Sequence, residues 1–132
     1  MISGIGVDVS SIKRIEESLL RFGRRFVERI LHPDERNPYS VAPDAAAFMA
    51  KRFAIKEACA KALGTGIREG VSFHDFIVEH DKLGKPLLRI DGEAAARCQR
   101  SGIATWHISV SDEGDTVTAF AVFEYDSKKL RR

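Results

Sequence analysis

Alternation between apolar and polar residues predicts β-strands near both ends of the chain. The segment Ile2 to Val9 is short, apolar and rich in glycine and β-forming residues. Residues 106–111 alternate strictly between apolar and polar, and a polar turn at 112–115 leads into the apolar segment 117–125. Because successive side chains of a strand point to opposite faces, these last segments predict a β-hairpin with one polar face.

A spacing of three and four residues between apolar positions predicts helices after the first strand. Apolar residues recur at this spacing from Ile12 to Phe26, and Gly23 is expected to break or bend that helix. A second short helix is expected to continue to Leu31. The segment 32–43 holds three prolines and therefore indicates an irregular connection.

The middle of the chain predicts a long helix and a second hairpin. Asp44 is a suitable N-cap for a helix that ends near Leu63, where a Gly-Thr-Gly stop follows. Segments 73–80 and 86–90 are expected to be paired strands, and a short helix is expected at 93–100.

The order of these elements is β-α-α-α-β-β-α-β-β. It favours an α+β fold, with a mostly antiparallel sheet and helices packed on one side. We find no linker or internal repeat, so we expect residues 1–132 to form a single domain.

Composition narrows the class of protein. The chain has 132 residues, is 44% hydrophobic and carries a net charge of only +2, which argues against a dedicated nucleic-acid binder. Cys59 and Cys98 have no metal-binding or disulfide pattern, which favours a cytoplasmic location. No apolar run has the length of a membrane span, and the N-terminus lacks the features of a signal peptide, so Met1 is expected to be the mature start.

A carboxylate follows two glycines in the first strand. Gly4 and Gly6 remove side chains from one face, so another element can approach closely, and Asp8 is expected where the strand ends. Taken alone, Asp8 is more simply interpreted as a turn former or a cap.

A second carboxylate lies on the long helix. Glu57 and Lys61 are one turn apart, on a face with the small residues Ala50 and Ala54, so the glycine strand could bring Asp8 to them. Two converging carboxylates suit Mg²⁺, and Lys61 could then neutralise phosphate oxygens. A solvated Glu-Lys pair is an equally good reading of the spacing alone.

Polar residues share one face of the 106–111 strand. His107, Ser109 and Ser111 define a face that is either solvated or binds a polar ligand. The Gly64 turn could cradle a phosphate, although a plain helix stop is the simpler reading.

Arginines recur along the first helical segment. Arg14, Arg21 and Arg25 would form a stripe if the helix continued through Gly23, with Arg24 near its edge. The stripe is either a solvated helix face, which we favour from the spacing, or a docking strip for an acidic partner.

Together these motifs resemble the short, single-domain class of 4′-phosphopantetheinyl transferases, the holo-acyl-carrier-protein synthases. The resemblance runs from Ile2 to about Tyr125. Its most specific stretches are Gly-Ile-Gly-Val-Asp at 4–8 followed by Arg14, and Arg-Phe-Ala-Ile-Lys-Glu-Ala at 52–58 with its continuation through Gly66. Gly-Lys-Pro at 84–86 and His-Ile-Ser-Val-Ser at 107–111 follow in the family's order.

The resemblance implies an activity and a set of roles. The family transfers phosphopantetheine from coenzyme A to a serine of apo acyl carrier protein with Mg²⁺, which supports fatty acid biosynthesis. It implies Asp8 and Glu57 as metal ligands and Lys61 at the phosphates. The nucleotide part of coenzyme A would be bordered by Phe48, Arg52, Gly64, Lys85, Pro86 and His107, and the carrier protein would face Arg14, Arg21, Arg24 and Arg25.

Other expectations also come from this resemblance. The serine's base would be Glu57, or a metal-bound water that Glu57 orients, with His107 second. The class is generally homotrimeric, with sites between subunits. Asp112 stands where many members have a histidine. The competing hypotheses are a non-catalytic binding module and, less favoured, a nucleic-acid binder.

Overall fold

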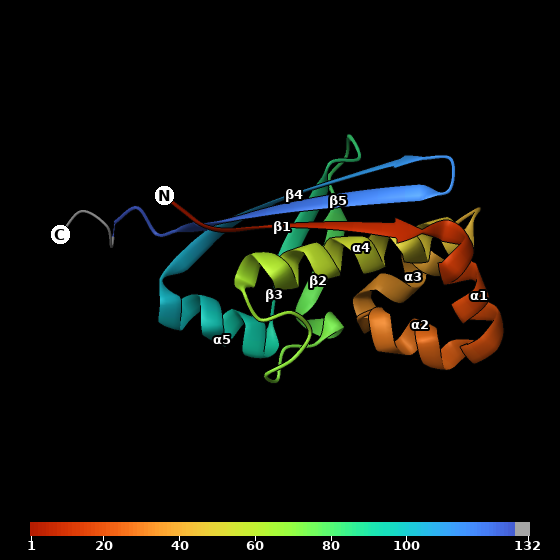
Figure 1. Ribbon diagram of the computed structural model, residues 1–132, viewed down its shortest axis with the longest axis horizontal. Coiled ribbons are helices and arrows are strands. Elements are labelled where there is room, and N and C mark those ends of the chain that lie inside the picture. The colour runs from red at the N-terminus through yellow and green to blue at the C-terminus, as the bar shows by residue number, and fades with distance from the viewer. Residues whose placement is uncertain (129–132) are drawn as a thin grey trace.

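Residues 1–128 of the computed structural model form two antiparallel sheets and five α-helices (Figure 1). The larger sheet has the order β1-β5-β4, and β2 and β3 form a separate pair. The α+β prediction with antiparallel strands is therefore confirmed, although the strands divide into two sheets. The strand bounds are β1 Ile2–Ser11, β2 Phe76–His80, β3 Pro86–Ile90, β4 Ile103–Glu113 and β5 Thr116–Tyr125.

The helices lie on one side of the three-stranded sheet, with the long helix α4 directly against it (Figure 1). Short 3₁₀ turns η1 and η2 precede α3 and β2. The bounds are α1 Ile12–Phe22, α2 Arg24–Ile30, η1 Pro33–Glu35, α3 Arg36–Ser40, α4 Ala45–Leu63, η2 Phe73–Asp75 and α5 Gly92–Ser101.

Glycine allows β1 to lie unusually close to α4. A Cβ at Gly4 would lie 2.0 Å from the carbonyl oxygen of Ala62, and one at Gly6 would lie 1.9 Å from that of Ala58. Since real side chains never come this close to backbone, only glycine fits both positions. The predicted close approach of strand and helix is confirmed, and it brings the β1 backbone against the second half of α4.

The ends of α4 follow the sequence signals. The Asp44 side chain accepts a hydrogen bond from the Ala47 amide, and Gly64 ends the helix in the left-handed conformation at φ 94°. Each end thus satisfies backbone groups that have no partner within the helix.

Two expectations about local structure are wrong. Segment 32–43 is not irregular: the His32 ring accepts a hydrogen bond from the Asp34 amide and starts η1, and α3 follows. The segment from Phe73 begins as a 3₁₀ turn, so β2 starts only at Phe76. The expected break at Gly23 is confirmed: Gly23 ends α1 at φ 57°, so the condition for one continuous stripe of arginines is not met.

The sheet face away from α4 carries exposed apolar side chains. Ile5, Val7 and Val9 of β1 are 59%, 50% and 66% exposed, and Phe120 of β5 is 44% exposed. Contiguous apolar surface of this kind is typical of an interaction face.

Within residues 1–128, no helix combines the length and the apolarity needed to cross a membrane.

Candidate active site

Asp8, Glu57 and Lys61 come together where β1 crosses α4. The Lys61 ammonium donates to Asp8 Oδ1 at 3.2 Å and to the Val7 carbonyl at 2.9 Å. β1 continues to Ser11, so Asp8 lies within the strand and not at its end as expected. It points toward α4, as do the two glycines, because alternate residues of a strand share a face.

The two carboxylates influence each other. Burial raises the pKa of Glu57, and the nearby charge of Asp8 raises it further, while the cations Lys61 and Arg29 act in the opposite direction. Asp8 Oδ2 is buried and has no hydrogen-bond partner among the described residues. A buried carboxylate oxygen without a donor is costly, which indicates that a cation or another donor is needed there.

This donor set fits Mg²⁺. Mg²⁺ is usually bound by one or two carboxylates, with water and substrate phosphates completing its shell. In residues 1–128, no group of three or more His, Cys, Asp or Glu side chains forms a closed cage. Asp8 and Glu57 therefore offer the incomplete oxygen shell that a metal shared with a phosphate substrate requires.

A cavity of about 640 Å³ opens beside these residues. Its lining is strongly cationic, and the residues that line it are Arg29, Glu57, Lys61, Gly64, Thr65, Gly66, Ile67, Arg68 and Phe73. Sequence reasoning missed Arg29, Arg68 and Phe73, because they lie on segments whose approach to α4 has no sequence signal. The cavity has the charge and size for an anionic ligand.

The turn after α4 borders this cavity as a helix stop. The amides of Gly64, Thr65 and Gly66 all donate to the Ala60 carbonyl, at 3.1–3.2 Å. The simpler reading of this turn is therefore correct, because these three amides already have a partner. Gly64 forms part of the cavity wall, and its amide is not free to bind phosphate.

Two other predicted residues line a different hollow. Phe48 and Arg52 lie in the first half of α4 and line a hollow of about 270 Å³ with Lys51, His80 and Val110. The Arg52 guanidinium lies 4.6 Å from the centre of the Phe48 ring. Arg52 is about 14 Å along the helix axis from Lys61, at the usual rise per residue.

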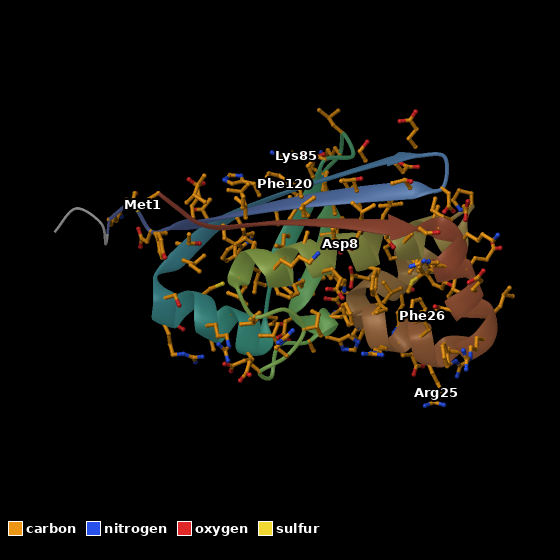
Figure 2. The ribbon with its side chains drawn as sticks, in the orientation of Figure 1. Met1, Asp8, Arg25, Phe26, Lys85 and Phe120 are labelled. Atoms are coloured by element: carbon orange, nitrogen blue, oxygen red, sulfur yellow. The ribbon has the colours of Figure 1, made fainter. Side chains whose placement is uncertain are left out.

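His107 and the β2–β3 turn also lie apart from Asp8. The His107 ring makes a 2.8 Å contact with Glu124 on the exposed sheet face, and strand alternation places that face opposite Asp8. Lys85 lies in the turn at the top of Figure 2, whereas Asp8 lies between β1 and α4. Pro86 opens β3 directly after Lys85. One chain therefore does not bring all the predicted site residues together.

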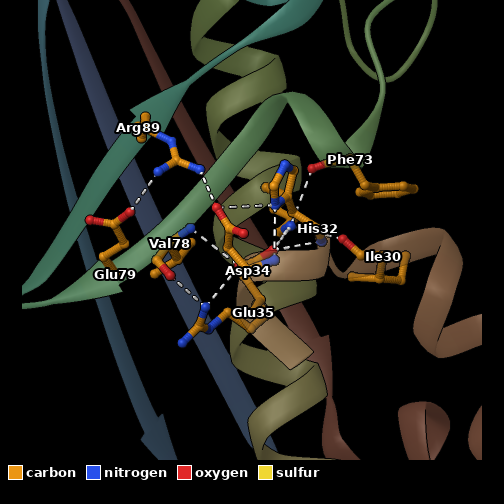
Figure 3. Close-up of polar contacts among 10 residues, drawn as sticks. Ile30, His32, Asp34, Glu35, Phe73, Val78, Glu79 and Arg89 are labelled. Atoms are coloured by element: carbon orange, nitrogen blue, oxygen red, sulfur yellow. Dashed lines mark hydrogen bonds and ion pairs between the residues drawn. The ribbon is translucent and has the colours of Figure 1, made fainter. Parts of the chain in front are cut away.

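A buried ionic network behind the cavity was not foreseen (Figure 3). Glu35, 1% exposed, accepts hydrogen bonds from Arg52, Lys56 and the amides of His32 and Val78. Arg52 also donates to the Val78 carbonyl, so one nitrogen of its guanidinium, Nη1, makes both of these bonds within the fold. The stripe of Met49, Arg52, Lys56 and Cys59, at helical spacing, was the sequence signal that two cations point inward.

Asp112 and the four predicted docking arginines lie at the surface of the molecule. Asp112 stands where the resemblance led us to expect a histidine. Its carboxylate lies 3.4 Å from the Lys51 ammonium, so an ion pair occupies this position. Arg14 and Arg21 lie on α1, whereas Arg24 and Arg25 lie on α2, and all four are exposed. Figure 2 shows Arg25 at the outer edge of the molecule, away from the sheet.

Known proteins are similar to this chain in sequence and in fold. The 4′-phosphopantetheinyl transferase superfamily matches residues 4–121. The holo-[acyl-carrier-protein] synthase of Vibrio cholerae serotype O1 is 47% identical over 124 residues, which is 94% of this chain and 98% of the relative.

Solved structures give the same result. The crystal structure of holo-[acyl-carrier-protein] synthase from Neisseria meningitidis has a TM-score of 0.89 and 46% identity, over 94% of this chain and 99% of that one. A Bacillus anthracis holo-(acyl-carrier-protein) synthase in complex with CoA (3′,5′-ADP) has a TM-score of 0.80 and 38% identity, over 96% and 99% of the two chains.

Proposed function

The chain belongs to the holo-[acyl-carrier-protein] synthases of the 4′-phosphopantetheinyl transferase superfamily, and we propose that it transfers phosphopantetheine from coenzyme A to a serine of apo acyl carrier protein. The resemblance and the enzyme class predicted from the sequence motifs are confirmed by this membership. The roles of individual residues, the metal, the location and the assembly are proposals that rest on the geometry above.

Asp8 and Glu57 would hold Mg²⁺. The support is the buried Asp8 Oδ2, which has no partner among the described residues, beside a second carboxylate and a cationic cavity of about 640 Å³. When bound, the ion would neutralise charge on the pyrophosphate of coenzyme A and orient it. Lys61, already held by Asp8 and the Val7 carbonyl, would add a fixed positive charge at the same phosphates.

The transfer is a displacement at phosphorus. The serine oxygen of the carrier protein forms a bond to the phosphorus that carries pantetheine, and the bond from that phosphorus to the bridging oxygen breaks. The electron pair leaves with adenosine 3′,5′-bisphosphate. The serine proton would go to a carboxylate oxygen of Glu57, because burial and the charge of Asp8 raise the pKa of this carboxyl above its usual value and so increase its affinity for a proton.

His107 is the less favoured base. Its ring lies on the sheet face opposite Asp8 and contacts Glu124, so within one chain it is not placed to receive that proton. We propose that His107 instead contacts the nucleotide part of coenzyme A, together with Phe48, Arg52, Lys85 and Pro86.

A second copy of the chain would complete the site. The proposed nucleotide contacts lie away from the Asp8 cavity in one chain, and the sheet face that carries His107 also exposes Ile5, Val7, Val9 and Phe120. Packing these apolar faces around a threefold axis would cover them and bring His107 to a neighbour's cavity. We therefore propose a homotrimer, and light scattering in solution measures its mass.

Carrier protein would dock along α1 and α2. Arg14, Arg21, Arg24 and Arg25 are exposed there, and a hollow of about 380 Å³ lies beside them, lined by Ser18, Phe22, Arg25, Phe26 and Arg29. Cations around a partly apolar hollow fit an acidic helical partner. The docking surface would therefore extend over two helices, α1 and α2, and not along one continuous stripe of arginines.

The experiment that tests this function is the intact mass of the carrier protein. Purified protein is incubated with apo carrier protein, coenzyme A and Mg²⁺, with and without a chelator. We expect a gain of one phosphopantetheine per carrier that disappears with the chelator. No gain with a carrier of proven competence would contradict the function and favour the non-catalytic binding module, and a gain that resists the chelator would contradict the metal proposal.

Two further predictions accompany this function. We propose that the domain spans residues 1–132, of which 129–132 lie outside the described part. The cytoplasmic location expected from Cys59 and Cys98 also stays a prediction. Both thiols are free and buried, which is consistent with a reducing compartment.

A further inference from the structure

Arg29 is a cation of the active-site cavity for which the motifs assign no role. It lies in the last turn of α2 and lines the cavity with Glu57 and Lys61. Its guanidinium lies 5.9 Å from the centre of the Phe73 ring, which forms part of the same wall. Its charge also acts on the Glu57 carboxyl, so the two side chains face the same space.

The Arg29 guanidinium has no acceptor within the part of the chain that the structure describes. In residues 1–128 it makes no ion pair and no hydrogen bond, whereas Lys61 is bonded to Asp8 and Arg24 lies 4.0 Å from Glu28. All of its donors are therefore available to a ligand. An arginine with free donors beside carboxylates and a cationic loop is suited to bind an oxyanion.

The fold holds Arg29 in place from behind. The buried Lys56 ammonium donates to the carbonyl of Ile30, the next residue, at 2.8 Å and to the carbonyl of Phe73 at 3.2 Å. One ammonium thus fixes both the end of α2 and the residue whose ring lies beneath the guanidinium. Groups that are held before the substrate arrives need no rearrangement during the reaction, which is what makes electrostatic stabilisation effective.

Arg29 also lies between the two proposed substrates. It lines both the active-site cavity and the hollow beside α1 and α2, and Arg25 of the proposed docking surface lies one turn before it. The phosphoryl group passes from coenzyme A to the carrier protein where these two surfaces meet. Arg29 approaches this point from α2, whereas Lys61 and Glu57 approach it from α4.

We propose that Arg29 is a catalytic residue that contacts the nonbridging oxygens of the phosphoryl group in transfer. This inference rests on the proposed function and deepens it. As the bond from the serine oxygen forms and the bond to the bridging oxygen breaks, the planar guanidinium binds two phosphoryl oxygens with parallel N–H donors. The leaving adenosine 3′,5′-bisphosphate takes the electron pair, and Arg29 itself gains and loses no proton.

Steady-state kinetics of Arg29→Gln test this role, with Arg24→Gln as the comparison on the same helix. We expect Arg29→Gln to lower kcat by at least about 30-fold, as for the loss of one donor to a developing oxyanion. The KM for carrier protein and the Kd of coenzyme A, measured by calorimetry, should change less than about threefold, because the contact strengthens in the transition state. Arg24→Gln should instead raise the KM for carrier protein with little change in kcat.

Arg29→Lys provides the second variant. It keeps the charge and loses the planar fork, so its kcat should fall between those of Arg29→Gln and the unchanged protein. Thermal unfolding checks that each variant is folded, and Arg29→Lys serves as the test if Arg29→Gln does not fold.

Several results would overturn the inference. The inference is wrong if kcat is undiminished in Arg29→Gln, or in Arg29→Lys where that variant serves as the test. The inference is also wrong if the only change is a raised KM for carrier protein, as in Arg24→Gln, because Arg29 would then be a docking residue. Normal transfer by the unchanged protein in these cases would leave the proposed function intact. No transfer by the unchanged protein would overturn both.

Discussion

Lys56 and Glu57 are neighbours on α4, yet their charges have opposite environments. The Lys56 side chain is fully buried, and its ammonium donates to Glu35 and to the carbonyls of Ile30 and Phe73. Glu57 faces the cavity, partly buried, with its pKa raised by burial and by the charge of Asp8. One turn of helix therefore carries a completed ionic network on one side and an incomplete one on the other.

The difference separates charges that hold the fold from charges that are available for chemistry. Every oxygen of Glu35 has two donors, so removing any member leaves a buried charge without compensation. At the cavity, Asp8 Oδ2 has no donor among the described residues, and the Glu57 carboxylate is disfavoured until a cation arrives. Substitutions should therefore reduce stability on the first side and activity on the second.

Among substitutions of Asp8, Glu35 and Gly6, Asp8→Asn should show the largest effect. Loss of this charge removes one proposed Mg²⁺ ligand and the partner of Lys61, so we expect transfer to fall on the order of 100- to 1,000-fold with little loss of stability. Carrier mass against time measures the rate. Glu79→Gln, which neutralises an exposed carboxylate on β2, is the matched control and should keep the original rate. Equal rates for the two variants would contradict a role for Asp8.

Glu35→Ala should destabilise the protein more than any cavity substitution. It leaves Arg52 and Lys56 buried without a carboxylate, which costs about 3–5 kcal/mol of unfolding free energy. Denaturant unfolding measures this loss. The neighbouring Asp34→Ala removes an exposed pair with Arg89 and should leave the midpoint unchanged within error. Similar midpoints for both variants would mean that the network does not stabilise the fold.

Gly6→Ala should have a smaller effect, and it should lower both stability and activity. The added Cβ would meet the Ala58 carbonyl oxygen at 1.9 Å, so β1 must move away from α4 at a cost of about 1–3 kcal/mol. Asp8 lies two residues further along the same strand face and would move with it. We expect a lower denaturant midpoint together with slower transfer. Unchanged values of both would contradict the close approach of strand and helix.

Much of the site could be predicted from local patterns. Gly4 and Gly6 indicated a close approach, the spacing of Glu57 and Lys61 placed them on one helix face, and Asp44 indicated where that helix begins. Each of these signals lies within a few residues of the feature it predicts. Their chemistry depends on residue type and spacing, which a sequence displays directly.

The parts that were missed depend on contacts between distant segments. Glu35 lies in a proline-rich stretch that indicated an irregular connection, and nothing local shows that it turns inward to meet Arg52 and Lys56. Arg29 was passed over for a similar reason, because its place at the cavity depends on how α2 packs against η2. His107 lies on a face to which we assign a role only through the proposed second copy of the chain, and one sequence does not describe such an assembly.

Glu57→Gln tests the central claim most directly, because transfer and stability should change in opposite directions. A carboxyl with a raised pKa binds its proton more tightly in the folded state, so the unfolding free energy falls as pH rises from the usual value of 4.5 through the raised one. Glutamine removes this loss.

The measurement is denaturant unfolding of Glu57→Gln and the unchanged protein at pH 4 and pH 7 without Mg²⁺, together with carrier mass at pH 7 with Mg²⁺. We expect transfer to be abolished and the variant to gain stability relative to the unchanged protein between pH 4 and pH 7. Retained transfer, or a variant that is less stable at pH 7, would contradict the assignment of Glu57 to chemistry and not to the fold.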